Sequence, residues 1–192
     1  MPLAERRTQL LDAALRVIDW DGYEKVTIDA IAREAGVTRP VVYGAFGNLE
    51  ELLMNLLDRQ QARGMAQMRA AVPLSIRRGD TRGSVHEAVV ALFQMVIDDP
   101  LTWRPILFAS RDAPEVARAR VALEWENVRV AVQLFIASAL PEGSGVDPEV
   151  ASHVVLATLE HFGRLLMSEP DRFTPEQLAG TATAVVAPLL RP

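Results

Sequence analysis

The sequence predicts an all-α protein of about nine helices, and three observations support that fold class. Apolar residues recur at spacings of three and four along most of the 192 residues, which is the period of one helix face. No stretch alternates convincingly between apolar and polar residues, as a half-buried strand would. Helix start signals also recur, with a capping residue followed three positions later by Glu or Gln at Ser84, Asp112 and Thr174.

The first two predicted helices are separated by a break at Gly22. The first has the apolar face Leu11, Ala14, Leu15 and Ile18. The second follows Thr27, which suits an N-cap, and Asp29 in its first turn lies near the positive end of the helix dipole. The apolar face of this helix is Ile28, Ile31, Ala32 and Ala35. Gly36 then suits the left-handed conformation in which many helices end.

A short third helix and a long fourth helix follow. Thr38 is the expected N-cap of the third, and Pro40 fits its first turn, where a missing N–H does no harm. Val42 and Phe46, one turn apart, are expected to face inward. The segment from Asn48 begins the fourth helix with a capping-box-like pattern. The buried stripe expected on that helix is Leu49, Leu52, Leu53, Leu56 and Leu57.

The rest of the chain continues as helices. Gly64 is an expected weak point in the fourth helix, and Pro73 ends it. Ser84 opens a helix with the stripe Val85, Ala88, Val89, Leu92, Phe93 and Val96. Further helix starts are expected at Asp99, Asp112, Asp147 and Thr174. Residues 77–83 and 141–145 are expected to be loops.

Composition limits the class of protein. The net charge is −5, cysteine is absent, and no apolar run approaches the roughly 20 residues of a membrane-spanning helix. Without cysteine, disulfides and cysteine-ligated zinc are excluded. The N-terminal segment is charged and amphipathic, unlike a secretory signal. We therefore expect a cytoplasmic protein with no membrane partner and no cofactor.

The segment from Val26 to Phe46 indicates two short helices joined by a tight turn at Gly36. Two helices crossing at a fixed angle about such a turn place the second in the major groove of DNA. We therefore expect a helix-turn-helix domain over residues 1–48 and a larger domain over residues 49–192. Residues 1–48 carry six basic and seven acidic side chains, so phosphate binding must depend on which face the charges occupy.

The residues from Thr27 to Leu53, with a long helix starting just after Tyr43 and Phe46, resemble the TetR family of one-component transcriptional repressors. Beyond about the first quarter of the chain, only length and helix count agree with that family. The resemblance implies that the start of the third helix reads base edges and its flanks grip phosphates. The implied DNA-binding residues are Thr27, Thr38, Arg39, Pro40, Val41, Tyr43, Gly44 and Asn48.

Each implied contact has its own chemistry. The resemblance places Tyr43 and Thr27 on phosphates, while Arg39 suits bidentate reading of a guanine, worth about 1–3 kcal/mol of discrimination. Arg39 also has the least evident structural role, because an exposed arginine beside a proline stabilises little. Leu49 stands where the family commonly has lysine, and Gly44 where larger residues are usual, so the grip on phosphates is expected to be weaker.

The last two helices are the expected dimer interface, because two half-sites call for a two-fold dimer and small residues let helices approach closely. The interface residues expected are Val154, Thr158, His161, Phe162, Leu165, Leu178, Ala182, Val185 and Val186. The alternative is that these faces only cover the core of their own subunit.

Aromatic residues interleaved with polar ones between residues 90 and 135 suggest a pocket for a small-molecule effector. The lining expected is Phe93, Trp103, Arg104, Phe108, Arg111, Trp125 and Asn127. On one continuous helix, Arg104 and Arg111 share a face and suit an anionic group. The alternative is that the aromatic residues only fill core. The resemblance implies that a bound effector tilts the fourth helix and separates two DNA-reading heads.

The function expected is therefore a sequence-specific, DNA-binding transcriptional regulator: a dimeric repressor of a palindromic operator, released by a small molecule. A constitutive or architectural DNA-binding protein without an effector is the alternative, and activation instead of repression stays open. An enzyme or a purely ligand-binding helical protein is disfavoured. The histidines His86, His153 and His161 stand singly, and neither a glycine-rich phosphate loop nor a nucleophile elbow occurs.

Overall fold

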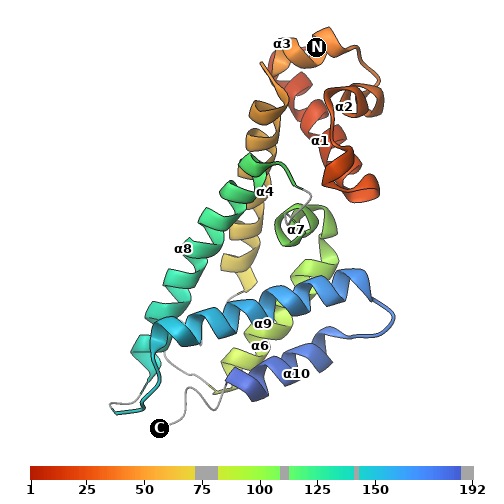
Figure 1. Ribbon diagram of the computed structural model, residues 1–192. Helices are drawn as coiled ribbons and strands as arrows, with labels where there is room; N and C mark the ends of the chain where they lie inside the picture. The colour runs from red at the N-terminus through yellow and green to blue at the C-terminus, as the bar shows by residue number, and fades with distance from the viewer. Residues whose placement is uncertain (72–81, 109–112, 141–142, 187–192) are drawn as a thin grey trace. The chain divides into compact units, whose positions relative to one another are not determined.

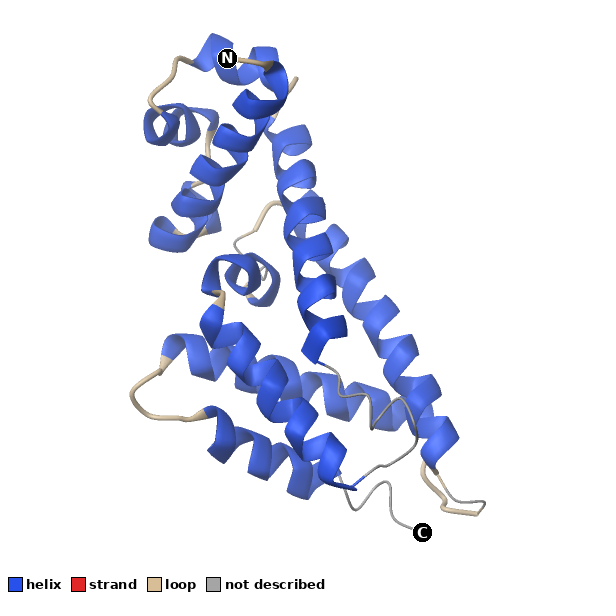
Figure 2. Ribbon diagram, turned by 180° about the vertical axis from the view of Figure 1, so that it is seen from behind, coloured by secondary structure: helices blue, strands red, loops and turns tan. Residues whose placement is uncertain are grey.

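The computed structural model describes residues 1–71, 82–108, 113–140 and 143–186. Every regular element in these ranges is helical, as Figure 2 shows, and the prediction of an all-α fold is confirmed. The elements are α1 (Leu3–Asp21), the 3-10 turn η1 (Tyr23–Lys25), α2 (Ile28–Ala35), α3 (Arg39–Ala45), α4 (Leu49–Ala71), α6 (Arg82–Asp98), α7 (Pro100–Leu107), α8 (Glu115–Ala139), α9 (Pro148–Ser168) and α10 (Pro175–Val186), labelled in Figure 1. Within the described ranges, none of these helices is both long and apolar enough to cross a membrane.

The chain divides into two compact units, each built from two segments of the sequence. The first unit comprises Met1–Gly64 and Leu101–Ala122, and the second comprises Met65–Pro100 and Leu123–Pro192. The expected division into functional domains at residues 48 and 49 stays a prediction.

In the first unit, α1 packs against both α2 and α3, and local signals fix where these helices begin and end. The hydroxyl of Thr27 accepts a hydrogen bond from the N–H of Ala30 at 3.1 Å, which confirms the predicted N-cap of α2. Gly36 ends α2 with φ 65° and ψ 35°, the left-handed conformation that glycine adopts without a Cβ penalty. Among the fully buried side chains of this unit are Leu10, Ile31, Val42, Phe46, Leu52, Leu53 and Leu56.

The expectation for Thr38 is corrected in part. Thr38 occupies the N-cap position of α3, but its side chain makes no capping hydrogen bond. An N-cap oxygen accepts from the second or third backbone N–H of the helix, and the second residue of α3 is Pro40, which has none. The third N–H, from Val41, is taken by the carbonyl of Thr38 at 3.0 Å.

The start of α4 is a near match to the predicted capping box. The Oδ1 of Asn48 accepts from the N–H of Glu51 at 2.7 Å, and the Glu51 carboxylate accepts from the N–H of Gly47 at 2.9 Å. The helix then runs through Gly64 without interruption, and Pro73 lies outside the described residues. A Cβ on Gly64 would lie 3.3 Å from Cη2 of the buried Trp103, so glycine permits a close approach there.

In the second unit, two predicted helix starts are confirmed and one is shifted. Asp147 caps α9 by accepting from the N–H of Glu149 at 2.8 Å. Thr174 and Gln177 make a complete capping box on α10, with reciprocal hydrogen bonds of 3.1 and 3.3 Å. Helix α6 begins at Arg82, two residues before the start predicted at Ser84. Asp112 lies outside the described residues.

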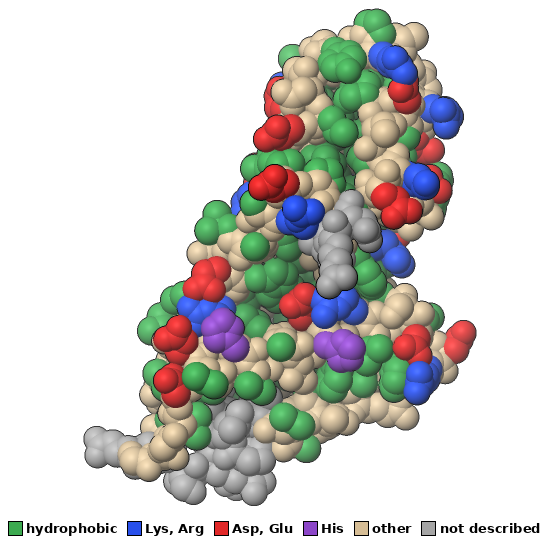
Figure 3. All heavy atoms as spheres, viewed as in Figure 1, with side chains coloured by type: hydrophobic (Ala, Val, Ile, Leu, Met, Phe, Trp, Pro, Cys, Tyr) green, Lys and Arg blue, Asp and Glu red, His purple; other side chains and the backbone are tan. Residues whose placement is uncertain are grey.

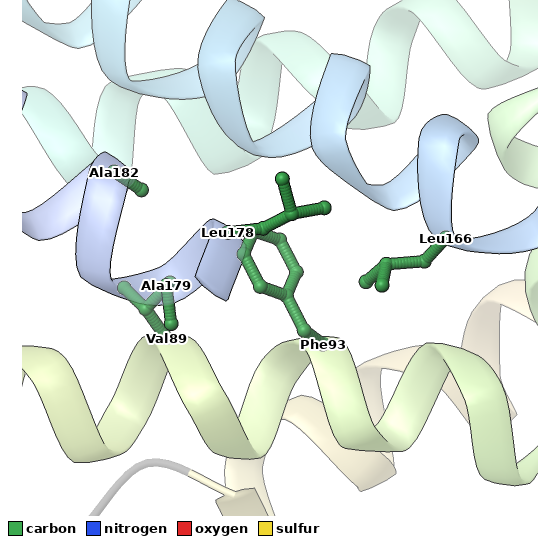
Figure 4. Packing of buried hydrophobic residues seen from close by; sticks show 6 residues of the cluster. All are labelled: Val89, Phe93, Leu166, Leu178, Ala179 and Ala182. Atoms are coloured by element: carbon green, nitrogen blue, oxygen red, sulfur yellow. The ribbon is translucent and has the colours of Figure 1, made fainter. Parts of the chain in front are cut away.

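The core of the second unit is formed by α6, α9 and α10, which pack together. Figure 4 shows side chains from these three helices converging: Val89, Phe93, Leu166, Leu178, Ala179 and Ala182. Leu178 and Ala182 are 6% and 2% exposed within this cluster. Their side chains therefore face the core of their own subunit, as in the alternative given for these helix faces, and their place in a dimer interface stays a prediction.

Candidate nucleic-acid interface

Helix α3 has one face fixed in the core and one face in solvent. Val42 and Ala45 are 0% and 4% exposed, and Phe46 directly after the helix is 1% exposed. Successive helical residues are about 100° apart, so this anchoring leaves the residues at 39–41 and 43–44 outside the core. These positions are all exposed. The outward face of α3 is therefore set by its inward anchors.

All eight residues predicted to contact DNA are exposed: Thr27, Thr38, Arg39, Pro40, Val41, Tyr43, Gly44 and Asn48. They come from the start of α2, from α3 and from the residue before α4, all within the first unit. Tyr43 is 53% exposed and Val41 is 36% exposed, although both are large apolar side chains. The ring of Tyr43 therefore lies more in solvent than in the core of this unit.

Arg39 has a partner that sequence reasoning missed. Its Nε and Nη2 donate hydrogen bonds to the two carboxylate oxygens of Asp29, which links α3 to the first turn of α2. Arg39, expected to have the least evident structural role, thus has one specific contact within the protein. The ion pair remains open to solvent, with side chains 62% and 49% exposed, so it contributes little to stability. The hydrogen bonds to Asp29 and the charge of its carboxylate raise the pKa of Arg39.

Two residues of α1 hold the ends of α2 and α3. The Nε of Arg7 donates to the carbonyl of Ala45, the last residue of α3, at 2.9 Å, and its guanidinium lies 5.0 Å from the ring centroid of Phe46. The Nε2 of Gln9 donates to the carbonyl of Ala35, the last residue of α2, at 2.9 Å. Both acceptors are carbonyls that a helix end leaves without an internal partner. These contacts span 38 and 26 residues, and no local sequence signal announces them.

The charge pattern gives no simple basic surface. Arg7 pairs with Glu51 at 3.3 Å, and Arg16 pairs with Glu34 at 2.5 Å. On the face shown in Figure 3, acidic and basic side chains of the N-terminal helices are interspersed. Any binding to phosphates must therefore rely on hydroxyls, backbone N–H groups and a few individual cations.

The residues predicted to line an effector pocket belong to both units. Phe93, Trp125 and Asn127 lie in the second unit, and Trp103, Arg104 and Phe108 lie in the first. Phe93 belongs to the core cluster, and Asn127 is exposed with its amide 3.4 Å from Glu124. Their role in effector binding stays a prediction.

The condition for a shared face of Arg104 and Arg111, one continuous helix, is not met. Arg104 pairs with Asp19 at 2.7 Å and lies 5.7 Å from the ring centroid of Phe108. Helix α7 ends at Leu107, so Arg104 and Arg111 do not share one continuous helix. Arg111 itself lies outside the described residues.

The predicted dimer residues on α9 include an exposed stripe. Val154 is 43% exposed, His161 is exposed, and Val150, one turn before Val154, is 61% exposed. Thr158, Phe162 and Leu165 are half-buried. On α10, Val185 is 50% exposed, and the side chain of Val186 lies outside the described residues.

Comparison with known proteins points to one family. The family described as "Bacterial regulatory proteins, tetR family" matches residues 10–56, which include α2, α3 and the start of α4. The chain is 33% identical over 127 residues to the transcriptional activator FasR of Mycolicibacterium smegmatis, covering 65% of this chain and 56% of FasR. It is 33% identical over 97 residues to the nicotine-responsive transcriptional repressor HdnoR of Paenarthrobacter nicotinovorans, covering 50% and 48% of the two chains. These alignments thus span about half the length of each relative.

A solved structure extends the likeness in fold to nearly the whole chain. A TetR-like transcriptional regulator from a Rhodococcus strain superposes with a TM-score of 0.75 at 19% identity, covering 97% of this chain and 96% of that one. Identity at that level supports the fold alone. Together with the helix-turn-helix geometry and the matched segment, these findings confirm the resemblance: the chain belongs to the TetR family of bacterial regulatory proteins.

Proposed function

We propose that this protein is a sequence-specific DNA-binding transcriptional regulator that acts as a homodimer and responds to a small-molecule effector. The outward face of α3 carries the proposal. Arg39, Val41 and Tyr43 are exposed there, while the core holds the opposite face of the same short helix. A rigid helix with an arginine and apolar groups on its free side suits the major groove, which presents guanine acceptors and thymine methyl groups.

In this proposal each exposed residue has a role. Arg39 reads a guanine, Val41 contacts a thymine methyl, and Tyr43 directs its hydroxyl to a phosphate. Thr27 and Asn48 already accept capping hydrogen bonds through their side-chain oxygens. Their contribution to DNA binding therefore comes from the helix N-termini that they cap, where backbone N–H groups favour a phosphate.

The dimer is proposed to form through the exposed stripe of α9 and the outer face of α10. Val150, Val154 and His161 follow one another at spacings of four and seven on α9, which places them on one face. Val185 adds an exposed valine from α10. A two-fold pair would present two copies of α3 to two half-sites.

The sign of regulation is proposed to be repression, with effector binding releasing the operator. The relatives include one protein named an activator and one named a nicotine-responsive repressor, so both signs occur among similar chains. An effector must bind the DNA-free arrangement more tightly than the DNA-bound one, by a factor equal to the loss of operator affinity.

Selection of bound DNA from a random pool tests DNA binding, dimer symmetry and half-site spacing together. We expect the full chain to enrich an inverted repeat whose half-sites lie about one helical turn, or a multiple of it, apart. Enrichment of no sequence at low salt would exclude sequence-specific binding. Enrichment of a single, asymmetric half-site would exclude the dimer.

A further inference from the structure

The second unit contains an apolar cavity of about 130 Å³ that is lined by α6, α8, α9 and α10 and is partly open to solvent. Eight of its ten described lining residues are apolar, among them Val89, Val132, Ile136 and Leu159. None of the residues predicted to bind an effector is among these ten. The cavity therefore supplies a candidate ligand site that the sequence did not indicate.

The two polar lining residues, Thr158 and Thr183, already have hydrogen-bond partners within the protein. The hydroxyl of Thr158 donates to the carbonyl of Val154 at 2.8 Å. The Oγ1 of Thr183 lies 3.4 Å from Nδ1 of His86, within hydrogen-bond distance. A buried water needs two to four polar partners, and a buried charge without a partner is strongly disfavoured. Neither water nor an ion is well matched to such walls.

We propose that this cavity binds a small uncharged apolar molecule, the size of one aromatic ring or a short alkyl chain. An engineered apolar cavity of about 150 Å³ in another protein stays dry and binds benzene or xenon. The present cavity has a comparable volume and a comparable lining. That its ligand is also the effector rests on the proposed function, whereas binding itself does not.

Titration of the full chain with toluene tests the proposal, with benzoate as a matched probe that adds one carboxylate to the ring. We expect saturable calorimetric binding of one toluene per chain and a higher melting temperature at saturation, because a ligand that binds only the folded state stabilises it. Benzoate should give neither. Absence of saturable toluene binding, or equal binding of benzoate, would overturn the proposal.

Two phenylalanine substitutions on α8 locate the site. Val132→Phe fills the cavity and should abolish toluene binding, whereas Leu134→Phe adds a ring at a position that is 65% exposed and should retain it. If Val132→Phe does not fold, Val155→Phe fills the same cavity from α9. Wild-type toluene binding in a folded cavity-filling variant would overturn the assignment.

The same samples separate this inference from the proposed function. Toluene binding that leaves affinity for the enriched DNA unchanged overturns the effector role alone. Failure to enrich any DNA overturns the proposed function and leaves the cavity result standing.

A second inference concerns the ion pair on the outward face of the first unit. Asp29 accepts from Nε and Nη2 of Arg39, which is one edge of the planar guanidinium. The other edge, made by Nη1 and Nη2, still carries two parallel N–H donors. A guanine is read by two such donors, directed at its O6 and N7. Contact with Asp29 and contact with guanine are therefore compatible.

We infer that Asp29 is a positioning residue that holds Arg39 for base reading, at a cost in affinity for DNA of any sequence. An arginine side chain gives up considerable rotamer freedom when it is fixed, and the carboxylate fixes it before DNA arrives. The same carboxylate is 49% exposed and repels phosphates, whatever the sequence. Discrimination and overall affinity should therefore respond to Asp29 in opposite directions.

The variant Asp29→Asn tests this, with Glu24→Gln as a control that makes the same charge change at an exposed residue of η1. The readout is the affinity ratio between the enriched operator and a copy in which the guanine contacted by Arg39 is replaced. In Asp29→Asn we expect this ratio to fall by about fivefold or more while affinity for unrelated DNA holds or rises. Glu24→Gln should keep the ratio.

The variant Arg39→Ala distinguishes base reading by Arg39 from the positioning role of Asp29. A ratio lowered in Arg39→Ala but unchanged in Asp29→Asn overturns only the role of Asp29. A ratio unchanged in both variants overturns base reading by Arg39, and with it the positioning role.

Discussion

The two consecutive helix pairs α2–α3 and α9–α10 make an instructive contrast. Every residue predicted to act on the surface of α2–α3 is exposed, whereas two of those predicted for α9–α10, Leu178 and Ala182, are buried in their own core. Helix α3 has seven residues and a single inward face, so its anchors dictate its outer face. Helices α9 and α10 carry apolar residues on more than one side. The buried side of a helix with one apolar stripe can be predicted from its sequence. For a helix with two apolar stripes, the sequence does not show which stripe packs in its own core.

The largest expected effect comes from removing the anchor of α3. Phe46 is 1% exposed and lies beneath the guanidinium of Arg7. Phe46→Ala should lower the free energy of unfolding by about 3–5 kcal/mol, because it removes a large buried ring and leaves a cavity. Urea unfolding of the full chain measures this. A loss below about 1 kcal/mol would show that α3 is not held from this side.

The next prediction concerns the outer stripe of α9. Val154→Glu should weaken self-association by at least about 2 kcal/mol, roughly thirtyfold, because dimer formation would bury an unpaired charge. Sedimentation velocity across a concentration series measures the dimer. Glu149→Gln, at an exposed residue in the first turn of the same helix, serves as a control and should leave it unchanged. A dimer of wild-type strength in Val154→Glu would remove this stripe from the interface.

Arg39 allows a test in which function and stability separate. Arg39→Ala should cost about 1–3 kcal/mol of discrimination between operator and altered DNA, because two base contacts are lost. Its free energy of unfolding should stay close to that of the wild type, because the ion pair with Asp29 is exposed. Lys25→Ala removes the same charge from an exposed position in η1 and should keep the discrimination. Equal operator binding by Arg39→Ala would exclude it as a base reader.

The smallest effect distinguishes two threonines at helix starts. Thr174→Ala should lower the free energy of unfolding by about 1 kcal/mol, since Thr174 accepts a capping bond from Gln177. Thr38→Ala should cost clearly less, because the Thr38 side chain makes no such bond. Chemical denaturation of both variants decides. Equal losses would mean that Thr38 caps α3 in solution after all.

The sequence predicted most accurately what depends on near neighbours. The caps at Thr27, Asp147 and Thr174 and the left-handed Gly36 follow from residues within a few positions of each other. Contacts between distant segments had no such signal. The bond from Arg7 to the end of α3 is an example.

The contacts that the sequence did not predict have the same physical origin. The ion pair between Arg39 and Asp29 depends on how α2 and α3 cross, and the burial of Leu178 depends on which neighbour α10 meets. The helical period indicates which side of a helix is apolar, but it does not indicate which neighbouring element that side contacts.

The bonds from Arg7 and Gln9 to the closing carbonyls of α3 and α2 have a consequence for redesign. The angle between the two helices is secured by α1, through main-chain acceptors that exist whatever side chains α3 displays. If α3 reads DNA as proposed, new target sequences can thus be sought by exchanging residues 39–41 and 43 together with Asp29, the partner of Arg39. If the stretch from Val26 to Phe46 were transplanted into another scaffold without α1, those carbonyls would lose their hydrogen-bond donors. The angle between α2 and α3 would then no longer be fixed from this side.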